Sequence, residues 1–173
     1  MAALTAAALI IFVIEAQVPL PFPIWGVKLG LANSVTLFAL FFRRGDTRAS
    51  TPERPGSEVS LTAVDAFLIL VCRIILGALF TGRFVTFVFS VSGGLLGFAA
   101  QAVTKRFVSN KQIWVCGAIG AVFHNVGQIF AAMLLMGTPA IAAYLPVLIA
   151  AGIVTGVITG LAAQITLSRI RRS

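Results

Sequence analysis

The side chains of this chain that could do chemistry are a few polar and charged groups set inside long apolar segments. A charged group at the centre of a bilayer costs at least about 2.5–3.5 kcal/mol, so it needs a partner or a ligand. Three polar groups fall within five residues at His124, Asn125 and Gln128, which favours a binding site. The candidate substrate-binding residues are Glu15, Lys28, Asn33, Arg73, Arg83, His124, Asn125 and Gln128.

The charges of this set indicate what kind of ligand it would bind. Lys28, Arg73 and Arg83 are positive, whereas Glu15 is the single carboxylate among the candidates. A guanidinium binds carboxylate or phosphate groups through two parallel hydrogen bonds. We therefore predict a cationic pocket for a ligand with an anionic group.

Two structural interpretations of the same residues stay open. Arg73 can form an ion pair with Glu15 that only holds helices together, braced by Asn125 or Gln128. His124 can be an ordinary hydrogen-bonded residue of a helix bundle rather than a ligand-binding group.

Composition places these residues in a membrane protein. The chain has 173 residues, of which 59% are hydrophobic and 10% charged, and its mean hydropathy is +1.03. Soluble domains carry about 25% charged residues. The apolar runs are continuous rather than alternating, so spanning helices are expected and a β-barrel is not. We predict an all-α integral membrane protein with a single domain over residues 1–173.

The hydrophobic pattern predicts six transmembrane helices. The N-terminus has no basic region before its apolar run, so a cleaved signal peptide is not expected. The first helix is short for a span, which needs about 20 residues. An outer loop is expected at about 17–29 and a polar cytoplasmic loop at about 43–60. The predicted helices cover about 2–16, 29–42, 61–80, 84–104, 113–136 and 140–167.

The net charge of +8 reports topology rather than a nucleic-acid partner. Basic residues cluster in loops that alternate with charge-poor loops, as the positive-inside rule predicts. This pattern places both termini in the cytoplasm and the chain in the inner (cytoplasmic) membrane, with ten Lys and Arg residues inside against Lys28 and Arg83 outside. The ten are Arg43, Arg44, Arg48, Arg54, Lys105, Arg106, Lys111, Arg169, Arg171 and Arg172.

This topology puts the buried polar residues in the outer half of the bundle. Asn33 is expected one turn inside the second helix, and Arg73 about 10 Å from the outer end of the third. Three prolines between Pro19 and Pro23 end the first helix. The segment from Pro19 to Asn33 is predicted to cover the mouth of an outward-facing pocket.

Other features predict packing rather than chemistry. Gly152, Gly156 and Gly160 recur at four-residue steps, which indicates close helix contact within the bundle or between subunits. Cys72 and Cys116 lie in apolar segments and have no metal-ligand spacing. No metal site and no cofactor is expected.

Three motifs give the sequence a resemblance to a known family. It resembles the Gx transporter family, which is also labelled heptaprenyl diphosphate synthase component I. The resemblance extends from Glu15 to the end of the last helix. The motifs are Gly26 to Asn33 (GVKLGLAN), the pair Gly93 and Gly94, and His124 to Gln128 (HNVGQ).

That family is similar in size and topology to the S components of energy-coupling factor (ECF) importers, which are six-helix substrate-binding proteins. The resemblance implies a substrate-binding subunit of a small-molecule importer, embedded in the lipid bilayer. It would work with an ECF-type transmembrane coupling subunit and ATPases, since the chain has no Walker motif of its own. The implied docking face comprises Ala2, Ala3, Ala6 and Ala7.

The synthase label suggests a different function. Prenyl diphosphate synthases bind magnesium and diphosphate through paired aspartate-rich motifs, and this chain has only Asp46 and Asp65, far apart. We therefore do not expect an enzyme. The alternatives are a non-catalytic membrane component associated with polyprenyl (heptaprenyl) diphosphate synthesis, with an isoprenoid-type ligand, and a structural membrane subunit.

Overall fold

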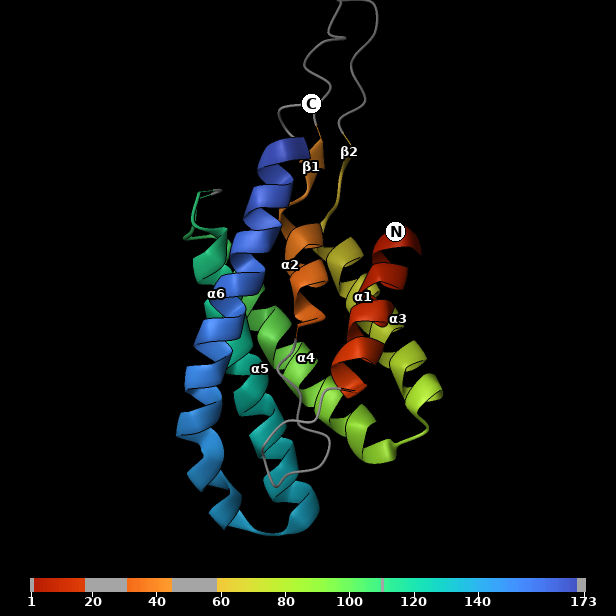
Figure 1. Ribbon diagram of the computed structural model, residues 1–173, viewed down its shortest axis with the longest axis vertical. Coiled ribbons are helices and arrows are strands. Elements are labelled where there is room, and N and C mark those ends of the chain that lie inside the picture. Colours follow the sequence, from red (N-terminus) through yellow and green to blue (C-terminus); the bar gives the residue numbers. More distant parts are fainter. Residues whose placement is uncertain (1, 18–30, 45–58, 110, 171–173) are drawn as a thin grey trace, which may run out of the picture.

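The computed structural model describes residues 2–17, 31–44, 59–109 and 111–170, and over these ranges the chain is almost entirely helical (Figure 1). The all-α prediction is confirmed. The elements in chain order are α1 (Ala2–Gln17), α2 (Asn33–Phe41), β1 (Arg43–Arg44), β2 (Val59–Ser60), α3 (Ala63–Thr81), α4 (Phe84–Thr104), α5 (Ile113–Met136), the 3-10 helix η1 (Pro139–Tyr144) and α6 (Leu145–Ile170).

Four helical segments of the described residues are long and apolar enough to cross a membrane: α3, α4, α5 and the continuous stretch of η1 and α6. This is consistent with a multi-pass membrane protein. Helix α1 is a shorter apolar helix, and α2 has only 9 residues. At 1.5 Å per residue α2 is about 14 Å long, less than half of the hydrocarbon core.

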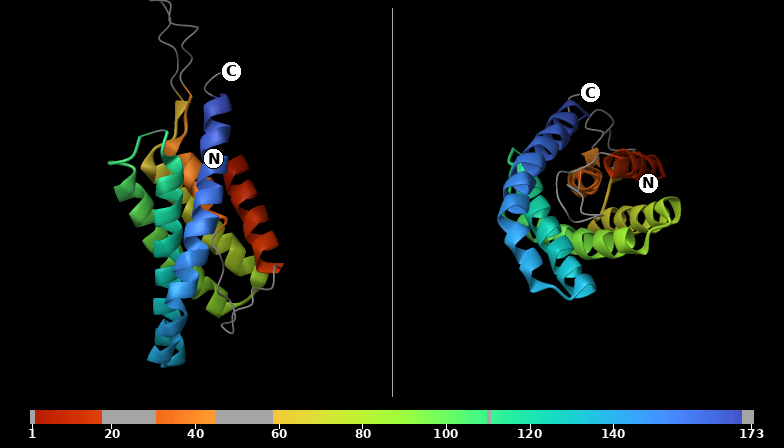
Figure 2. Two further views of the ribbon diagram at one scale, coloured as in Figure 1. Left: turned by 60° about the vertical axis from the view of Figure 1, so that its left-hand side comes forward. Right: turned by 60° about the horizontal axis from the view of Figure 1, so that its bottom comes forward.

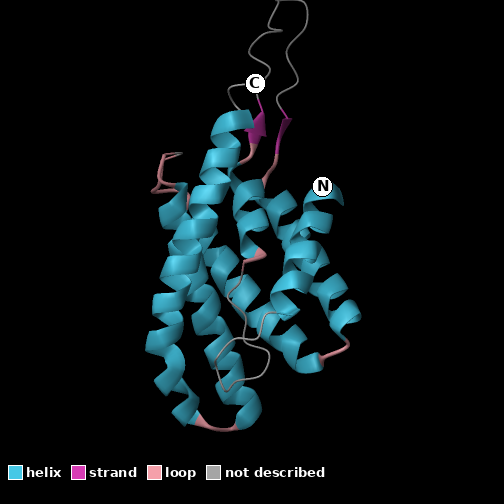
Figure 3. Ribbon diagram, viewed as in Figure 1, coloured by secondary structure: helices cyan, strands magenta, loops and turns pink. Residues whose placement is uncertain are grey.

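The two ends of the bundle differ in which connections they carry (Figures 1 and 3). The start of α1, the end of α6, the β1–β2 pair and the α4–α5 connection lie at one end. The α3–α4 and α5–η1 turns lie at the opposite end, which corresponds to the predicted outer side. The basic loops predicted to share one side of the membrane therefore leave the bundle from the same end.

Local signals in the sequence explain where α3 begins and ends. The Thr62 hydroxyl accepts a hydrogen bond from the Asp65 amide (3.2 Å), and the Asp65 carboxylate accepts one from the Thr62 amide (2.8 Å). This reciprocal capping box satisfies two amides at the helix start. Gly82 then ends α3 with a φ of +60°, a left-handed conformation that favours glycine.

Glycines bring α5 and α6 into close contact. A Cβ on Gly156 would lie 2.6 Å from the Cα of Ala118, and a Cβ on Gly160 would lie 2.6 Å from the Cα of Trp114. Gly152 likewise faces Asn125 of α5. Of the two packing alternatives for this glycine face, the structure therefore shows contact within the chain.

Helix α2 lies inside the bundle, where it contacts α1, α3, α4, α5 and α6 (Figure 2, right). Leu37 and Leu40 are fully buried. Lys105 reaches the C-terminal end of α2, because its Nζ donates to the Leu40 carbonyl (2.5 Å) and lies 5.6 Å from the centre of the Phe41 ring. A cation at this position satisfies a terminal carbonyl and complements the helix dipole.

Two predicted helix boundaries were wrong, and the predicted cytoplasmic loop contains a short pair of strands. Helix α2 was expected from about residue 29, but it begins at Asn33 after a turn at Leu31 and Ala32, so Asn33 is its first residue rather than one turn inside. The residue before it, Ala32, makes no side-chain cap, and the Asn33 side chain bonds to Arg73 of α3 rather than to the helix backbone. The predicted cytoplasmic loop ends in a short strand, with Val59 paired to Arg44 and Ser60 to Arg43. The last helix is preceded by η1 and continues to Ile170.

Candidate functional site

Three of the predicted site residues meet where α1, α2 and α3 converge. Arg73 of α3 is 3% exposed, and its Nη2 donates a 3.0 Å hydrogen bond to Oδ1 of Asn33, the first residue of α2. Glu15, near the end of α1, is 5% exposed and interacts electrostatically with Arg73. The convergence buries one positive and one negative charge together with an amide.

Helix α4 presents glycines to this group. A Cβ on Gly94 would lie 3.7 Å from Nη2 of Arg73, and a Cβ on Gly97 would lie 3.6 Å from Nδ2 of Asn33. The guanidinium and the amide therefore lie directly against the α4 backbone face. A larger side chain at either position would occupy the space beside these nitrogens.

The same turn of α4 also contacts the polar residues of α5. Nε2 of Gln128 lies 2.8 Å from Nε2 of His124, and both residues are buried. A Cβ on Gly93 would lie 2.8 Å from Nδ1 and Cε1 of the His124 ring. We call Glu15, Asn33, Arg73, His124 and Gln128 the polar cluster. Its α3 side contacts α4 at Gly94, and its α5 side contacts α4 at the adjacent Gly93.

Within the described ranges, Nε of Arg73 and Nδ2 of Asn33 are buried donors of the polar cluster that have no hydrogen-bond partner. Arginine only donates, so the Asn33 atom that meets it must be the carbonyl oxygen, and this fixes the other atom as the NH₂ donor. The Thr36 hydroxyl, one turn further along α2, is likewise buried without a partner there. A ligand with a hydrogen-bond acceptor would satisfy the two nitrogens, Nε of Arg73 and Nδ2 of Asn33.

Asn125 does not join the polar cluster. Its Nδ2 donates a 2.6 Å hydrogen bond to the carbonyl oxygen of Leu148 on α6, and a Cβ on Gly152 would lie 2.7 Å from the same nitrogen. Asn125 therefore connects α5 to α6. The residue that braces Arg73 is Asn33, rather than the expected Asn125 or Gln128.

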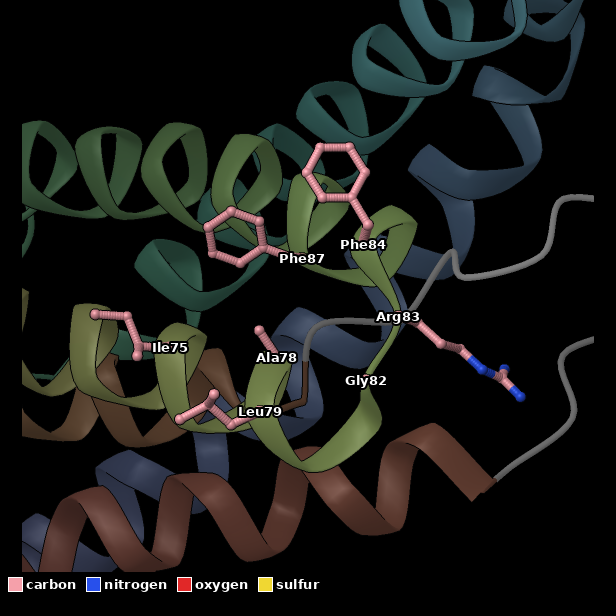
Figure 4. A pocket seen from close by; sticks show the side chains of 7 residues that line it. All are labelled: Ile75, Ala78, Leu79, Gly82, Arg83, Phe84 and Phe87. Carbon is pink, nitrogen blue, oxygen red and sulfur yellow. The ribbon is translucent and has the colours of Figure 1, made fainter.

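The other predicted cations do not add charge to the described cluster. Arg83 precedes α4 at the end of the bundle that carries the α3–α4 turn, is exposed, and points away from the neighbouring side chains of α3 and α4 (Figure 4). Lys28 lies outside the described residues. Of the three expected cations, the structure brings only Arg73 into the cluster, and the Glu15 carboxylate is present with it.

A shallow groove of about 500 Å³ lies beside Arg83, separate from the polar cluster (Figure 4). Its walls are apolar and come from the end of α3 and the start of α4. Leu79 and Phe84 are 74% and 70% exposed, as expected for a surface that faces lipid. The lining residues are Ile75, Ala78, Leu79, Gly82, Arg83, Phe84 and Phe87.

Sequence reasoning missed the hydroxyl groups on the inner face of α4. Thr86 and Ser90 are 5% and 7% exposed and precede Gly94 at four-residue steps. That spacing places all three residues on one face of a helix, and it was the signal that could have identified them. Within the described ranges, no three His, Cys, Asp or Glu side chains gather in a way that could hold a metal ion.

The expected docking face of α1 is largely open. Ala2, Ala3 and Ala6 are exposed, and Ala7 is partly buried. Helix α1 instead packs on α3 through Phe12, whose ring would lie 2.5 Å from a Cβ on Gly77.

The comparison with protein families confirms the family that the sequence resembles. The model of one protein family, described as heptaprenyl diphosphate synthase component I, matches residues 4–50 and 57–166. The interval between the two matched segments lies outside the described residues. No curated protein and no solved structure gives a significant match. With its helices, its polar cluster and nearly all of its length covered by this match, the chain belongs to the heptaprenyl diphosphate synthase component I family.

Proposed function

We propose that this protein is the substrate-binding membrane subunit of a small-molecule importer, similar to an S component, and that the polar cluster binds the substrate. The observation that carries the proposal is the pair of buried donors, Nε of Arg73 and Nδ2 of Asn33, which lack partners within the described ranges. A buried donor without a partner costs about 1–3 kcal/mol. A ligand with a carboxylate, phosphate or carbonyl oxygen would recover that free energy on binding.

The opposite charges of Glu15 and Arg73 allow the site to stay unliganded between rounds of transport. Glu15 balances the charge of Arg73, so the unliganded site does not bury an isolated cation. Asn33 holds one guanidinium nitrogen and leaves Nε available. An anionic or acceptor-rich group therefore meets a preoriented donor without first breaking the Arg73–Asn33 hydrogen bond.

Transport would depend on partner proteins. The sequence has no nucleotide-binding motif, so a coupling subunit and ATPases of the ECF type would supply the energy. The exposed alanines Ala2, Ala3 and Ala6 offer a surface on which another helix could approach closely. In this scheme the loaded bundle moves as a body.

The family description favours a second candidate, a non-catalytic membrane component associated with prenyl diphosphate synthesis. An isoprenoid diphosphate could place its phosphate oxygens on the same two donors. Asp65 is already used in the capping box of α3, and Asp46 lies outside the described residues. This candidate requires that the protein co-purify with a synthase subunit.

Native mass spectrometry of the protein released from mild detergent tests the proposal. We expect a retained small molecule in the wild type and in Arg83→Ala, an exposed arginine outside the cluster, and its loss in Arg73→Ala. Equal retention in Arg73→Ala and the wild type would overturn the assignment of the site. A wild type that retains no small molecule but carries a synthase subunit would favour the second candidate.

A further inference from the structure

We infer that Thr86 and Ser90 of α4 line the outer part of the substrate site, and that the substrate is therefore a hydrophilic solute rather than a prenyl chain. This inference rests on the proposed function, because it extends the site around Arg73 and Asn33. The geometry that points to it is the position of these two hydroxyls relative to Gly93, Gly94 and Gly97.

The neighbours of the glycines fix the direction of Ser90. Gly94 faces Arg73, and Gly93 faces the ring of His124. Ser90 lies three residues before Gly93 and four before Gly94, so with about 3.6 residues per turn its direction falls between theirs. Ser90 therefore faces the interior between the α3 and α5 sides of the polar cluster.

Helix α2 does not extend to these hydroxyls. It begins at Asn33, whose Nδ2 would lie 3.6 Å from a Cβ on Gly97. At 1.5 Å per residue, Ser90 lies about 10 Å and Thr86 about 16 Å further toward the outer end of α4 than Gly97. The inner face of α4 at Ser90 and Thr86 is thus outside the reach of α2.

The inner face of α4 carries hydroxyl groups, and its opposite face is apolar. Thr86 and Ser90 are buried on the inner face, whereas Val85 and Leu96 are each more than 40% exposed on the face where lipid would lie. A prenyl chain in the interior would offer these hydroxyls no hydrogen bond and would leave them only the carbonyls of their own helix, as the Ser92 hydroxyl uses the Val88 carbonyl. A solute with polar groups along its length would bond to them.

These positions also set the dimensions of the substrate. Gly94, at the level of Arg73, and Thr86 are eight residues apart, which corresponds to about 12 Å along the helix. The inferred substrate has a hydrogen-bond acceptor at the end that meets Arg73 and Asn33. Further polar groups lie within about 12 Å of that end.

Thiol accessibility in liposomes tests the inference without knowledge of the substrate. Ser90→Cys and Thr86→Cys are made in a background in which Cys72→Ser and Cys116→Ala remove the native thiols. Each variant is treated with a water-soluble sulfonate methanethiosulfonate and, separately, with apolar N-phenylmaleimide. The matched control is Ser92→Cys on the same helix, since the Ser92 hydroxyl donates to the Val88 carbonyl (3.0 Å) rather than facing the glycines of the cluster.

We expect the sulfonate reagent to modify Ser90→Cys and Thr86→Cys at least tenfold faster than Ser92→Cys. Reaction of both with N-phenylmaleimide alone would overturn the inference in favour of an apolar, prenyl-type interior. Reaction with neither reagent, while Arg83→Cys at the same end is modified, would also overturn it. Folding of each variant is verified by its elution as a monodisperse peak in detergent.

The binding experiment separates failure of this inference from failure of the proposed function. In native mass spectrometry, Ser90→Ala should retain at least tenfold less of the small molecule than Ser92→Ala. Loss of the molecule in Arg73→Ala, together with undiminished retention in Ser90→Ala, would overturn the inference and leave the proposed site in place. Undiminished retention in Arg73→Ala would instead overturn the proposed function.

Discussion

Arg73 and Asn33 are joined by a 3.0 Å hydrogen bond between side chains that lie forty residues apart in the sequence, and both side chains are buried. The bond connects the middle of α3 to the first residue of α2. It therefore fixes the start of the shortest α-helix in the described bundle and at the same time orients the guanidinium of the polar cluster.

Replacement of Asn33 by alanine should destabilise the protein. The change removes the acceptor of a charged donor, and a hydrogen bond to a charged group contributes about 1.5–3 kcal/mol. We expect a lower midpoint in a thermal scan of helical circular dichroism in detergent. Asn33→Asp keeps an acceptor for Nη2 and should retain more stability than Asn33→Ala. Equal stability of Asn33→Ala and the wild type would show that this bond does not stabilise α2.

Glu15 and Arg73 should be energetically coupled. Both side chains are buried and interact electrostatically, so removal of either charge leaves the other less compensated, and Glu15→Gln and Arg73→Met should each be destabilising. The double variant should cost less than the sum of the two, with a coupling of about 0.5–3 kcal/mol. Chemical unfolding of the four proteins in one detergent measures this cycle. Additive effects would contradict an electrostatic interaction between these two residues.

Substitution of Gly156 should disrupt the chain itself rather than its assembly with other subunits. A Cβ at this position would meet the Ala118 backbone at 2.6 Å, so Gly156→Leu forces α5 and α6 apart. We expect a lower thermal midpoint for the monomer. The loss of free energy of unfolding should exceed the value of about 1–3 kcal/mol that is typical of overpacking. Val154→Leu places the same side chain at a 59% exposed site of α6 and should be neutral. A Gly156→Leu monomer with wild-type stability and altered oligomeric state would support packing between subunits instead.

Asn125 should affect stability without affecting substrate retention. Its Nδ2 donates to the Leu148 carbonyl, whereas its Oδ1 has no partner within the described ranges, so Asn125→Ala removes one bond and one unsatisfied acceptor. We expect a modest loss of about 0.5–1.5 kcal/mol and unchanged retention of the small molecule in native mass spectrometry. Gln128→Ala, in the polar cluster, should lower retention. Loss of the molecule in Asn125→Ala at wild-type stability would return Asn125 to the site.

The sequence predicted the helical elements well because their signals are local. The bounds of α5 from Ile113 to Met136 agree with the prediction, since polar residues and a glycine flank a continuous apolar run. Gly82 and Gly137 end α3 and α5 in the left-handed conformation, as glycines after apolar runs often do. The positions of the basic residues predicted which connections share one end of the bundle.

The directions of the side chains could not be read from the sequence. His124 and Asn125 are adjacent, yet one faces Gly93 of α4 and the other bonds to Leu148 of α6. Adjacent residues of a helix point about 100° apart, so their side chains can contact two different helices. Which helix each one contacts follows only from the packing of the bundle. The start of α2 depended in the same way on a contact with a residue of α3 that only the folded bundle supplies.

The shortness of α2 has a consequence for how the protein is made in the membrane. A helix of 9 residues is too short to be inserted by itself as a stable span, which takes about 20 residues. Its first residue bonds to Arg73, and its C-terminal carbonyl is capped by Lys105, which the ribosome adds much later. Helix α2 therefore reaches its place only after α3 and α4 have been synthesised. We therefore expect correct insertion of α2 to require the later helices of the chain.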